Sequence, residues 1–473
     1  MFDAWGISIF VGFDFHNVDA LRLKSRKELL TLLFRKLLIL RIYSILFDGI
    51  KKLPAEYVGM KKELLLQWMA ESQMLEKANV RLNDAAIQVS EWFRKKGFRT
   101  CILKGQGNAL MYPNPNSRTP GDIDIWVVGG DKRVISFVRS ISPHEKACYH
   151  HIEFPSYKGV EVEVHYRPSF LLCFWHDRKL QKYSERVKEE QFSHRVMLGE
   201  QGEIAIPTAE FNLIFQLTHI FSHLMNEGIG LRQVVDYYYV LCDFYKVYQK
   251  SSKITPSLFF DKASCTRQFE SELSLHSLAS LFPLKEGSTS HPDPLTLRGE
   301  GGNRPTRCSE PLRSKDGGPS KVSPDCAGWD RRDAIGDMTS VTASTDSSAT
   351  AARSSSTAID RVQEELKELG LWKFAGGIMY IMQEVFGMPA SQLMVRPNEK
   401  YGKFVLNEVL EAGNFGRHDA RNRFGRSQLG HNLQRVYRDI KLARYFPGEA
   451  LCEPLFRVWH FFWRLKYKNK IIK

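Results

Sequence analysis

Hydrophobic and polar positions follow a helical repeat along most of the chain and a two-residue repeat in one central part. Residues 26–97 contain long stretches without Pro or Gly and have helical periodicity, as do residues 210–226 and 366–473. Residues 98–170 instead contain short apolar runs and strictly alternating segments, which are typical of strands. This pattern predicts an α+β protein, in which a small mixed β-sheet is joined to helix-rich N- and C-terminal parts.

One long segment matches neither pattern. Between residues 287 and 357 there is no Phe or Tyr and only one Trp, and Ser, Thr, Gly, Pro, Asp and Arg dominate. Such a composition buries too little apolar surface to offset the entropy of ordering. We therefore expect a disordered or unrelated insertion that carries no function. The expected division is a helical part at 1–97, a sheet core at 98–170, a helical part at 171–251, the insertion at 252–358 and a helical part at 359–473.

Two alternating strands carry acidic side chains on one face. In residues 119–128, Asp122 and Asp124 lie on the face opposite to the aliphatic side chains, because successive side chains point to opposite faces of a strand. In residues 160–166, three valines share one face and the polar face carries Glu161, Glu163 and His165. Carboxylates this close repel each other unless a cation lies between them, and Mg²⁺ prefers such oxygen ligands. A surface strand with solvated aspartates is the simpler alternative.

A basic turn precedes the acidic strand. The apolar run at 98–103 ends in Lys104-Gly105, and a polar loop at 112–118 ends in Arg118. Glycine allows backbone N–H groups to approach a phosphate closely, and both basic side chains are cationic donors for phosphate oxygens.

The ordered motifs resemble a known family. Lys104-Gly105, Arg118, Asp122-Ile-Asp124 and Glu163-Val-His165 are similar to the uncharacterised bacterial nucleotidyltransferases of the DNA polymerase beta-like superfamily. The resemblance extends over most of residues 30–250 and 360–465. It departs at Gln106, because the superfamily usually has Ser or Gly after the motif glycine. This departure concerns the contacts to the triphosphate more than the metal site.

The resemblance implies a metal-dependent transfer of a nucleoside monophosphate from a nucleoside triphosphate such as ATP to an unknown acceptor hydroxyl. Asp122, Asp124 and Glu163 would hold Mg²⁺ or Mn²⁺, with Glu163 also orienting or deprotonating the acceptor. Glu161 is the second choice for the third carboxylate. Lys104, Gly105 and Arg118 would bind the triphosphate.

Two other functions stay open. A catalytically silent descendant would retain the fold as a binding module, and Gln106 favours this reading. A metal-dependent sugar transferase also uses Asp-x-Asp, although there the pair usually follows a strand in a loop. The acceptor is open in each case: a small molecule, a protein side chain and an RNA end all fit.

Charge and cysteine content add little to this picture. The net charge of +14 is dispersed over the chain and suits polyanionic partners, but a solvated surface explains it more simply. The eight cysteines form no Cys-x-x-Cys pair, so a zinc ribbon is not expected and a reducing, cytoplasmic location fits. The apolar stretch 29–47 is interrupted by basic residues, so we expect a buried or amphipathic helix and no transmembrane segment.

Two pairs of residues in the helical part have a spacing of four. His219 and His223 share one helix face but lack the His-Glu-x-x-His pattern, so a structural pair is expected. Arg232 and Asp236 have a spacing that allows an ion pair within one helix.

Overall fold

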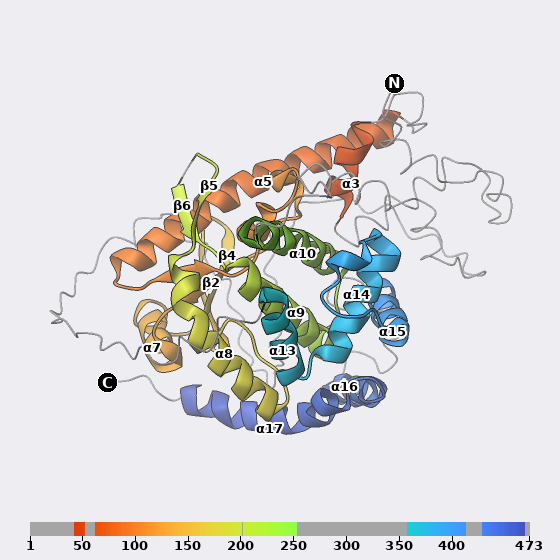
Figure 1. Ribbon diagram of the computed structural model, residues 1–473. Helices are drawn as coiled ribbons and strands as arrows, with labels where there is room; N and C mark the ends of the chain where they lie inside the picture. Colours follow the sequence, from red (N-terminus) through yellow and green to blue (C-terminus); the bar gives the residue numbers. More distant parts are fainter. Residues whose placement is uncertain (1–41, 53–61, 201, 253–356, 413–427, 469–473) are drawn as a thin grey trace. The chain divides into compact units, whose positions relative to one another are not determined.

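The computed structural model describes residues 42–52, 62–200, 202–252, 357–412 and 428–468. All of them belong to one compact unit, Met1–Leu284 with Thr357–Lys473. The elements, labelled in Figure 1, are α3 (Tyr43–Ile50), α5 (Lys62–Lys95), β1 (Thr100–Ile102), α6 (Gln106–Ala109), η3 (Pro115–Ser117), β2 (Ile123–Val127), α7 (Gly130–Ile141), β3 (His151–Tyr157), β4 (Val160–His165), α8 (Phe174–Ser193), β5 (Arg195–Leu198), β6 (Gly202–Ala205), α9 (Ala209–Asn226), α10 (Leu231–Ser252), α13 (Ala358–Glu368), α14 (Trp372–Phe386), η6 (Ala390–Gln392), α15 (Glu399–Ala412), α16 (Gln428–Ala443) and α17 (Pro447–Lys468).

The main sheet has four strands in the order β1-β2-β4-β3. β2 pairs with β1 antiparallel and with β4 parallel, and β3 pairs with β4 antiparallel, so the sheet is mixed. Every residue of β2 is buried, with Ile123, Ile125 and Val127 on the face opposite to Asp124, as the alternation predicts. The mixed sheet and the surrounding helices confirm the predicted α+β class.

A hairpin that the sequence reading missed follows the main sheet. β5 and β6 pair antiparallel around a short turn. The sequence predicts a helical part at 171–251, but α8 ends at Ser193 and β5 begins at Arg195. Four-residue strands such as these are too short for a periodicity to stand out.

Helices from before and after the expected insertion share one hydrophobic core. On α9, Phe221 packs against Phe374 of α14 with ring centroids 4.7 Å apart. On α10, Tyr238 packs against Phe386 of α14 at 5.5 Å. All four side chains are at most 2% exposed. The C-terminal helix α14 is therefore an integral part of the unit that contains the sheet.

The described residues meet the expected insertion at both ends. α10 continues to Ser252, and Thr357 with Ala358 form the N-cap and first residue of α13, although the sequence placed all three in the insertion. Residues 253–356, on which the expected disorder falls, lie outside the described residues. The expected helix within 29–47 also lies partly outside them, and its described end belongs to α3.

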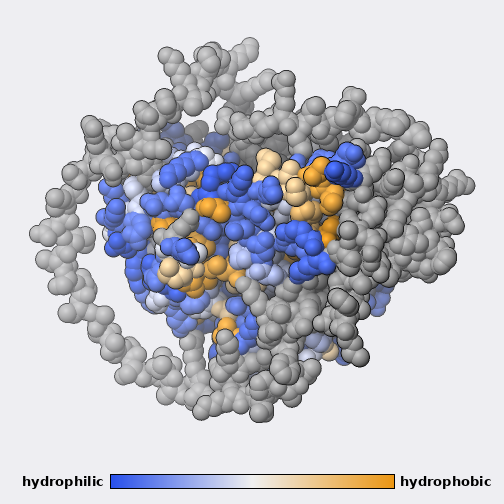
Figure 2. Space-filling view, turned by 90° about the horizontal axis from the view of Figure 1, so that it is seen from above, coloured by the Kyte–Doolittle hydropathy of each residue, from blue (hydrophilic) through white to orange (hydrophobic). Residues whose placement is uncertain are grey.

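Within the described residues, no helix is long and apolar enough to cross a membrane. On the face drawn in Figure 2, the described residues are mostly hydrophilic, with smaller hydrophobic patches between them.

Helix α13 begins with a capping box formed by Thr357 and Asp360. Thr357 Oγ1 accepts a hydrogen bond from the Asp360 backbone N–H, and the Asp360 side chain accepts one from the Thr357 backbone. We expect Thr357→Ala to lower the free energy of unfolding by about 1 kcal/mol, because one N–H group of the first turn loses its partner. Thr208→Ala is the matched control. Thr208 is the N-cap of α9 but makes no side-chain cap bond, so its loss in urea unfolding should be clearly smaller.

Candidate active site

The register between β2 and β4 brings two predicted carboxylates together. Asp124 pairs with Glu163 across the parallel strands, so their side chains leave the sheet on the same face. Asp124 is 2% exposed, and the Glu163 side chain is 16% exposed. Glu161 lies one pair further along β4 and is exposed to solvent. The positions therefore favour Glu163 over Glu161 as the neighbour of the Asp-x-Asp motif.

Asp122 precedes β2 and is half-buried. Its negative charge raises the pKa of both Glu163 and Lys104. Asp122 therefore lies within electrostatic reach of the same cluster.

Lys104 lies directly beside the acidic pair. Its Nζ is 3.1 Å from Asp124 Oδ2 and 3.2 Å from His219 Nε2. Burial lowers the pKa of Lys104, but the charges of Asp124 and Asp122 outweigh this effect, so the pKa is raised overall. At neutral pH an ammonium group therefore contacts the carboxylate that the sequence assigned to metal binding.

Gly105 has a backbone conformation that favours glycine. Its φ of 60° lies in the left-handed region, and an added Cβ would be 3.5 Å from the Asp122 carbonyl oxygen. The next side chain, Gln106, is 3% exposed and its Nε2 donates to Asn83 Oδ1 of α5. The residue that departs from the superfamily pattern is thus engaged with a neighbouring helix.

Arg118 forms a buried ion pair that the sequence did not reveal. Its Nε and one terminal nitrogen donate to the two oxygens of Asp236, each at 2.8 Å, and Tyr112 donates to the same carboxylate at 2.6 Å. Burial raises the pKa of Asp236, but Arg118 outweighs it and the pKa is lowered overall. Asp236, which the spacing placed opposite Arg232, is thus in contact with Arg118. Arg232 donates to the Thr119 carbonyl at 3.3 Å.

His165 lies between the two carboxylates. Its Nε2 is 2.9 Å from Asp124 Oδ1 and 3.5 Å from Glu163 Oε2. Burial lowers the pKa of His165, but hydrogen bonds to both carboxylates raise it to about 9. An imidazolium here removes much of the repulsion between the paired acids.

His151 was not singled out by the sequence reading. It pairs with His165 in the register of β3 and β4, and its Nδ1 is 3.5 Å from Glu163 Oε2 and 2.9 Å from His150 Nε2. Burial lowers the pKa of both His150 and His151. The consecutive histidines directly before an alternating segment were a usable signal, because they fall at the start of the neighbouring strand.

His219 and His223 contact each other as expected, with 3.1 Å between their Nε2 atoms. His219 also reaches Lys104, so this helix face borders the acidic cluster. Burial and the Lys104 charge hold the pKa of His219 well below its ordinary value. A neutral His219 can accept a hydrogen bond from the Lys104 ammonium group.

The two paired acids are ionised. Burial raises the pKa of Asp124, but Lys104 and His165 lower it further than burial raises it. Burial also raises the pKa of Glu163, while His151 and His165 bring it down to about 2. Both groups are therefore carboxylates at neutral pH.

The donor set fits a hard divalent ion. One oxygen each from Asp124 and Glu163 and one ring nitrogen of His165 lie within 4.8 Å of one another. The two carboxylates are the donors for such an ion, because the pKa of His165 of about 9 keeps its ring protonated at neutral pH. Asp124 Oδ2 is buried and receives no hydrogen bond from the described residues, although the Lys104 ammonium is close to it. Carboxylate oxygens from adjacent strands are the ligands that Mg²⁺ and Mn²⁺ prefer.

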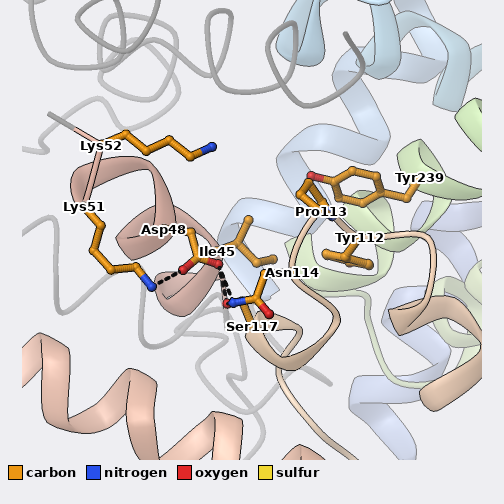
Figure 3. A pocket seen from close by; sticks show the side chains of 9 residues that line it. All are labelled: Ile45, Asp48, Lys51, Lys52, Tyr112, Pro113, Asn114, Ser117 and Tyr239. Carbon is orange, nitrogen blue, oxygen red and sulfur yellow. Dashed lines mark hydrogen bonds and ion pairs between the residues drawn. The ribbon is translucent and has the colours of Figure 1, made fainter. Parts of the chain in front are cut away.

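A separate cavity of about 360 Å³ lies between α3 and the loop at 112–117. Figure 3 shows Lys51 reaching Asp48 while Lys52 extends in another direction from the same helix end. None of the six predicted site residues lines this cavity. Tyr112 lines it and also donates to Asp236, so the Arg118 ion pair connects the cavity wall to the loop that precedes the acidic strand.

Residues 33–252 match the model of a family described as uncharacterised nucleotidyltransferase. The matched segment contains β1 to β4 and all six predicted site residues, so the predicted resemblance to an uncharacterised nucleotidyltransferase family is confirmed over these residues. Among curated proteins and solved structures, none matches the chain significantly.

The burial of the Arg118–Asp236 pair predicts a large effect of Asp236→Asn. Removing one partner leaves a buried, uncompensated charge, and we expect a loss of about 3–5 kcal/mol in the free energy of unfolding. The matched control is Glu189→Gln. Glu189 makes the same two-fold contact with Arg99, at 2.7 and 3.0 Å, but both side chains are exposed, so the loss should be at most about 1 kcal/mol.

Acid titration tests the same pair. The pKa of Asp236 is lower in the folded chain, so its contribution to stability is complete above the unfolded value of about 4 and is lost as the pH falls through the folded value. The difference in stability between wild type and Asp236→Asn should therefore shrink on acidification. A difference that stays constant down to the acid transition would contradict the ion-pair explanation.

Proposed function

We propose that the chain is a metal-dependent nucleotidyltransferase, which transfers a nucleoside monophosphate from a nucleoside triphosphate to an acceptor hydroxyl. The observation that carries this proposal is the parallel register of Asp124 and Glu163, with Lys104 in contact with Asp124. The family match of residues 33–252 supports nucleotidyl transfer in general. The acceptor is not specified by these features.

Asp122, Asp124 and Glu163 would hold the divalent ions, Mg²⁺ or Mn²⁺. When bound, two such ions neutralise the triphosphate and stabilise the attacking and leaving oxygens of an in-line displacement. The parallel strands keep Asp124 and Glu163 adjacent, and Asp122 adds charge at the end of β2. Lys104 contacts Asp124, and His165 contacts both Asp124 and Glu163, so an ion could bind these carboxylates only if both side chains gave up these contacts.

Lys104 is suited to bind phosphate once the carboxylates are occupied. Its side chain is 19% exposed, so the ammonium group borders solvent and can turn to an incoming anion. Gly105 leaves the backbone next to it without a side chain. Arg118 is less suited to this task, because Asp236 takes two of its three nitrogens. We assign Arg118 to positioning the loop that leads into β2.

Glu163 is better suited to ligand and orienting roles than to proton abstraction. A general base works best when its pKa is near the operating pH, and the pKa of Glu163 is about 2. The contact of His165 with Glu163 fixes the carboxylate against the sheet. Glu163 therefore orients the acceptor more effectively than it deprotonates it.

A non-catalytic binding module is the second candidate. It is favoured by the observation that two cations, Lys104 and His165, already neutralise Asp124, and by the engagement of Gln106 with α5. Calorimetry with a non-hydrolysable triphosphate, with and without Mg²⁺, separates the candidates. Triphosphate binding that requires Mg²⁺ supports the transferase, whereas triphosphate binding of equal affinity with and without Mg²⁺ supports the binding module.

The two aspartates should differ in their effect on stability. Asp122→Asn and Asp124→Asn should both reduce turnover by more than about 100-fold, because each removes a metal ligand. Asp124→Asn should also cost about 1–3 kcal/mol, because Lys104 and His165 lose their shared partner. Asp122→Asn should stay within about 0.5 kcal/mol. Pyrophosphate release from ATP, GTP, CTP or UTP with a small-molecule extract, beside urea unfolding, measures both quantities.

Glu163→Gln should reduce turnover by about 100-fold or more, whereas Glu161→Gln should change it less than about twofold. Both side chains lie on the polar face of β4, but only Glu163 lies against Asp124 and His165. If Glu163 binds metal, higher Mg²⁺ should partly restore the Glu163→Gln variant. Equal small effects at both positions would place the third carboxylate elsewhere.

A further inference from the structure

A second cluster of metal-ligating side chains lies where α17 meets the start of α8. Cys173, His176 and Glu449 each bring one ligand atom within 4.8 Å of the other two. His176 Nδ1 is 2.7 Å from Glu449 Oε1. Burial and the neighbouring Cys173 thiol raise the pKa of Cys452 to about 11, so Cys452 lies beside this three-residue cluster and is a candidate fourth donor. This cluster shares no residue with the acidic cluster on the sheet.

The four donors form two pairs, one at the start of α8 and one in α17, and the two residues of each pair are three positions apart. Cys173 is the N-cap residue of α8 and His176 follows three positions later. Glu449 and Cys452 are three positions apart within α17, so both point to one face of that helix. A search for Cys-x-x-Cys misses this set, because the two halves are Cys-x-x-His and Glu-x-x-Cys and lie far apart in the chain.

Backbone hydrogen bonds explain only part of this arrangement. Glu449 Oε2 accepts hydrogen bonds from the backbone N–H groups of Leu172 and Cys173, at 2.7 and 2.9 Å, directly before the first turn of α8. These bonds do not account for the approach of the Cys173 thiol and the His176 imidazole to the same carboxylate. Glu449 is 4% exposed, and among the described residues its only ion-pair partner is His176.

A third segment lies directly against the imidazole ring of His176. The turn between α13 and α14 contains Gly370, and a Cβ there would lie 2.4 Å from Cε1 of His176. Gly370 also has a φ of 70°, which disfavours other residues. The ring is therefore held against backbone and cannot swing away from Glu449 on that side.

We propose that Cys173, His176, Glu449 and Cys452 bind one Zn²⁺ ion. Two thiolates, one imidazole and one carboxylate form a tetrahedral set that suits zinc and not Mg²⁺. Zinc–ligand distances of about 2.0–2.3 Å place ligand atoms of one site about 3–4 Å apart, so the spacing of Cys173, His176 and Glu449 needs only small shifts, and Cys452 would have to move closer to complete the set. Binding replaces the thiol protons and the proton shared by His176 and Glu449, and these protons go to solvent.

All four positions are filled by the protein, which is the arrangement of a structural site. The ion would join the start of α8, which follows the sheet core, to the last helix of the chain. Besides the hydrogen bonds of Glu449, the contacts already present across this junction are aromatic, such as Phe174 with Trp459 at 5.7 Å. Zinc would add a bond that does not depend on hydrophobic packing.

Metal analysis of the full chain tests the proposal. The protein is produced in zinc-supplemented medium and freed of loose metal, and the expected content is about one zinc ion per chain. Cys173→Ala and Cys452→Ala should each lose most of it, and a strong chelator should lower the Tm of the wild type. Cys101→Ala, a buried cysteine of β1, and Asp124→Asn, in the acidic cluster, are the matched controls that should retain zinc.

Cobalt titration of the wild type keeps the test decisive when a variant does not fold. Co²⁺ bound at this site should give thiolate charge-transfer bands and a tetrahedral visible spectrum, both abolished by added Zn²⁺. The proposal is overturned if the wild type takes up neither metal, or if cobalt binds without thiolate bands. It is also overturned if zinc is lost in Asp124→Asn but retained in the two cysteine variants, since the ion would then belong to the acidic cluster.

Discussion

The parallel pairing of β2 with β4 is the constraint on which the candidate site depends. It places Asp124 directly beside Glu163, two carboxylates that burial alone would drive towards neutrality. Both are nevertheless ionised, because Lys104, His165 and His151 surround them with positive charge or hydrogen-bond donors. The sheet therefore carries a preformed acidic centre whose repulsion is balanced by groups of the chain itself.

The sequence was informative where one local pattern determines a position. Alternation along two segments was sufficient to put Asp124 and Glu163 on polar faces. Lys104, which the resemblance assigned to the triphosphate, lies directly beside Asp124. It was uninformative where the partner comes from a distant helix. Arg118 was assigned to phosphate, but tertiary packing directs it to Asp236, and nothing in the spacing of α10 predicts that choice. The Cys173 and Cys452 contact is similar, since its two halves come together only when α17 packs on α8.

The Arg118–Asp236 pair has a role beyond stability. It joins the loop before β2 to α10, and Tyr112 links the same carboxylate to the wall of the cavity beside α3. A bidentate pair resists rotation more than a single contact does, because two hydrogen bonds share one plane. The loop that delivers Asp122 to the sheet is therefore anchored in the helical part. A shift of α10 would therefore be transmitted to the loop that leads into β2.

Lys104 connects the acidic strand to α9 through a contact on each side. It shares its ammonium between Asp124 and His219, and His219 is kept neutral partly by that charge. If Lys104 turns to a phosphate, Asp124 loses one cation just when a divalent ion would supply another, and His219 loses the charge that lowers its pKa. The movement of Lys104 to a phosphate and the binding of a divalent ion at Asp124 favour each other. The ion replaces the positive charge that Asp124 loses, and the phosphate binds the ammonium group that the ion displaces. Under the proposed function, triphosphate and metal should therefore bind cooperatively at this site, and His219 of α9 would respond to the exchange.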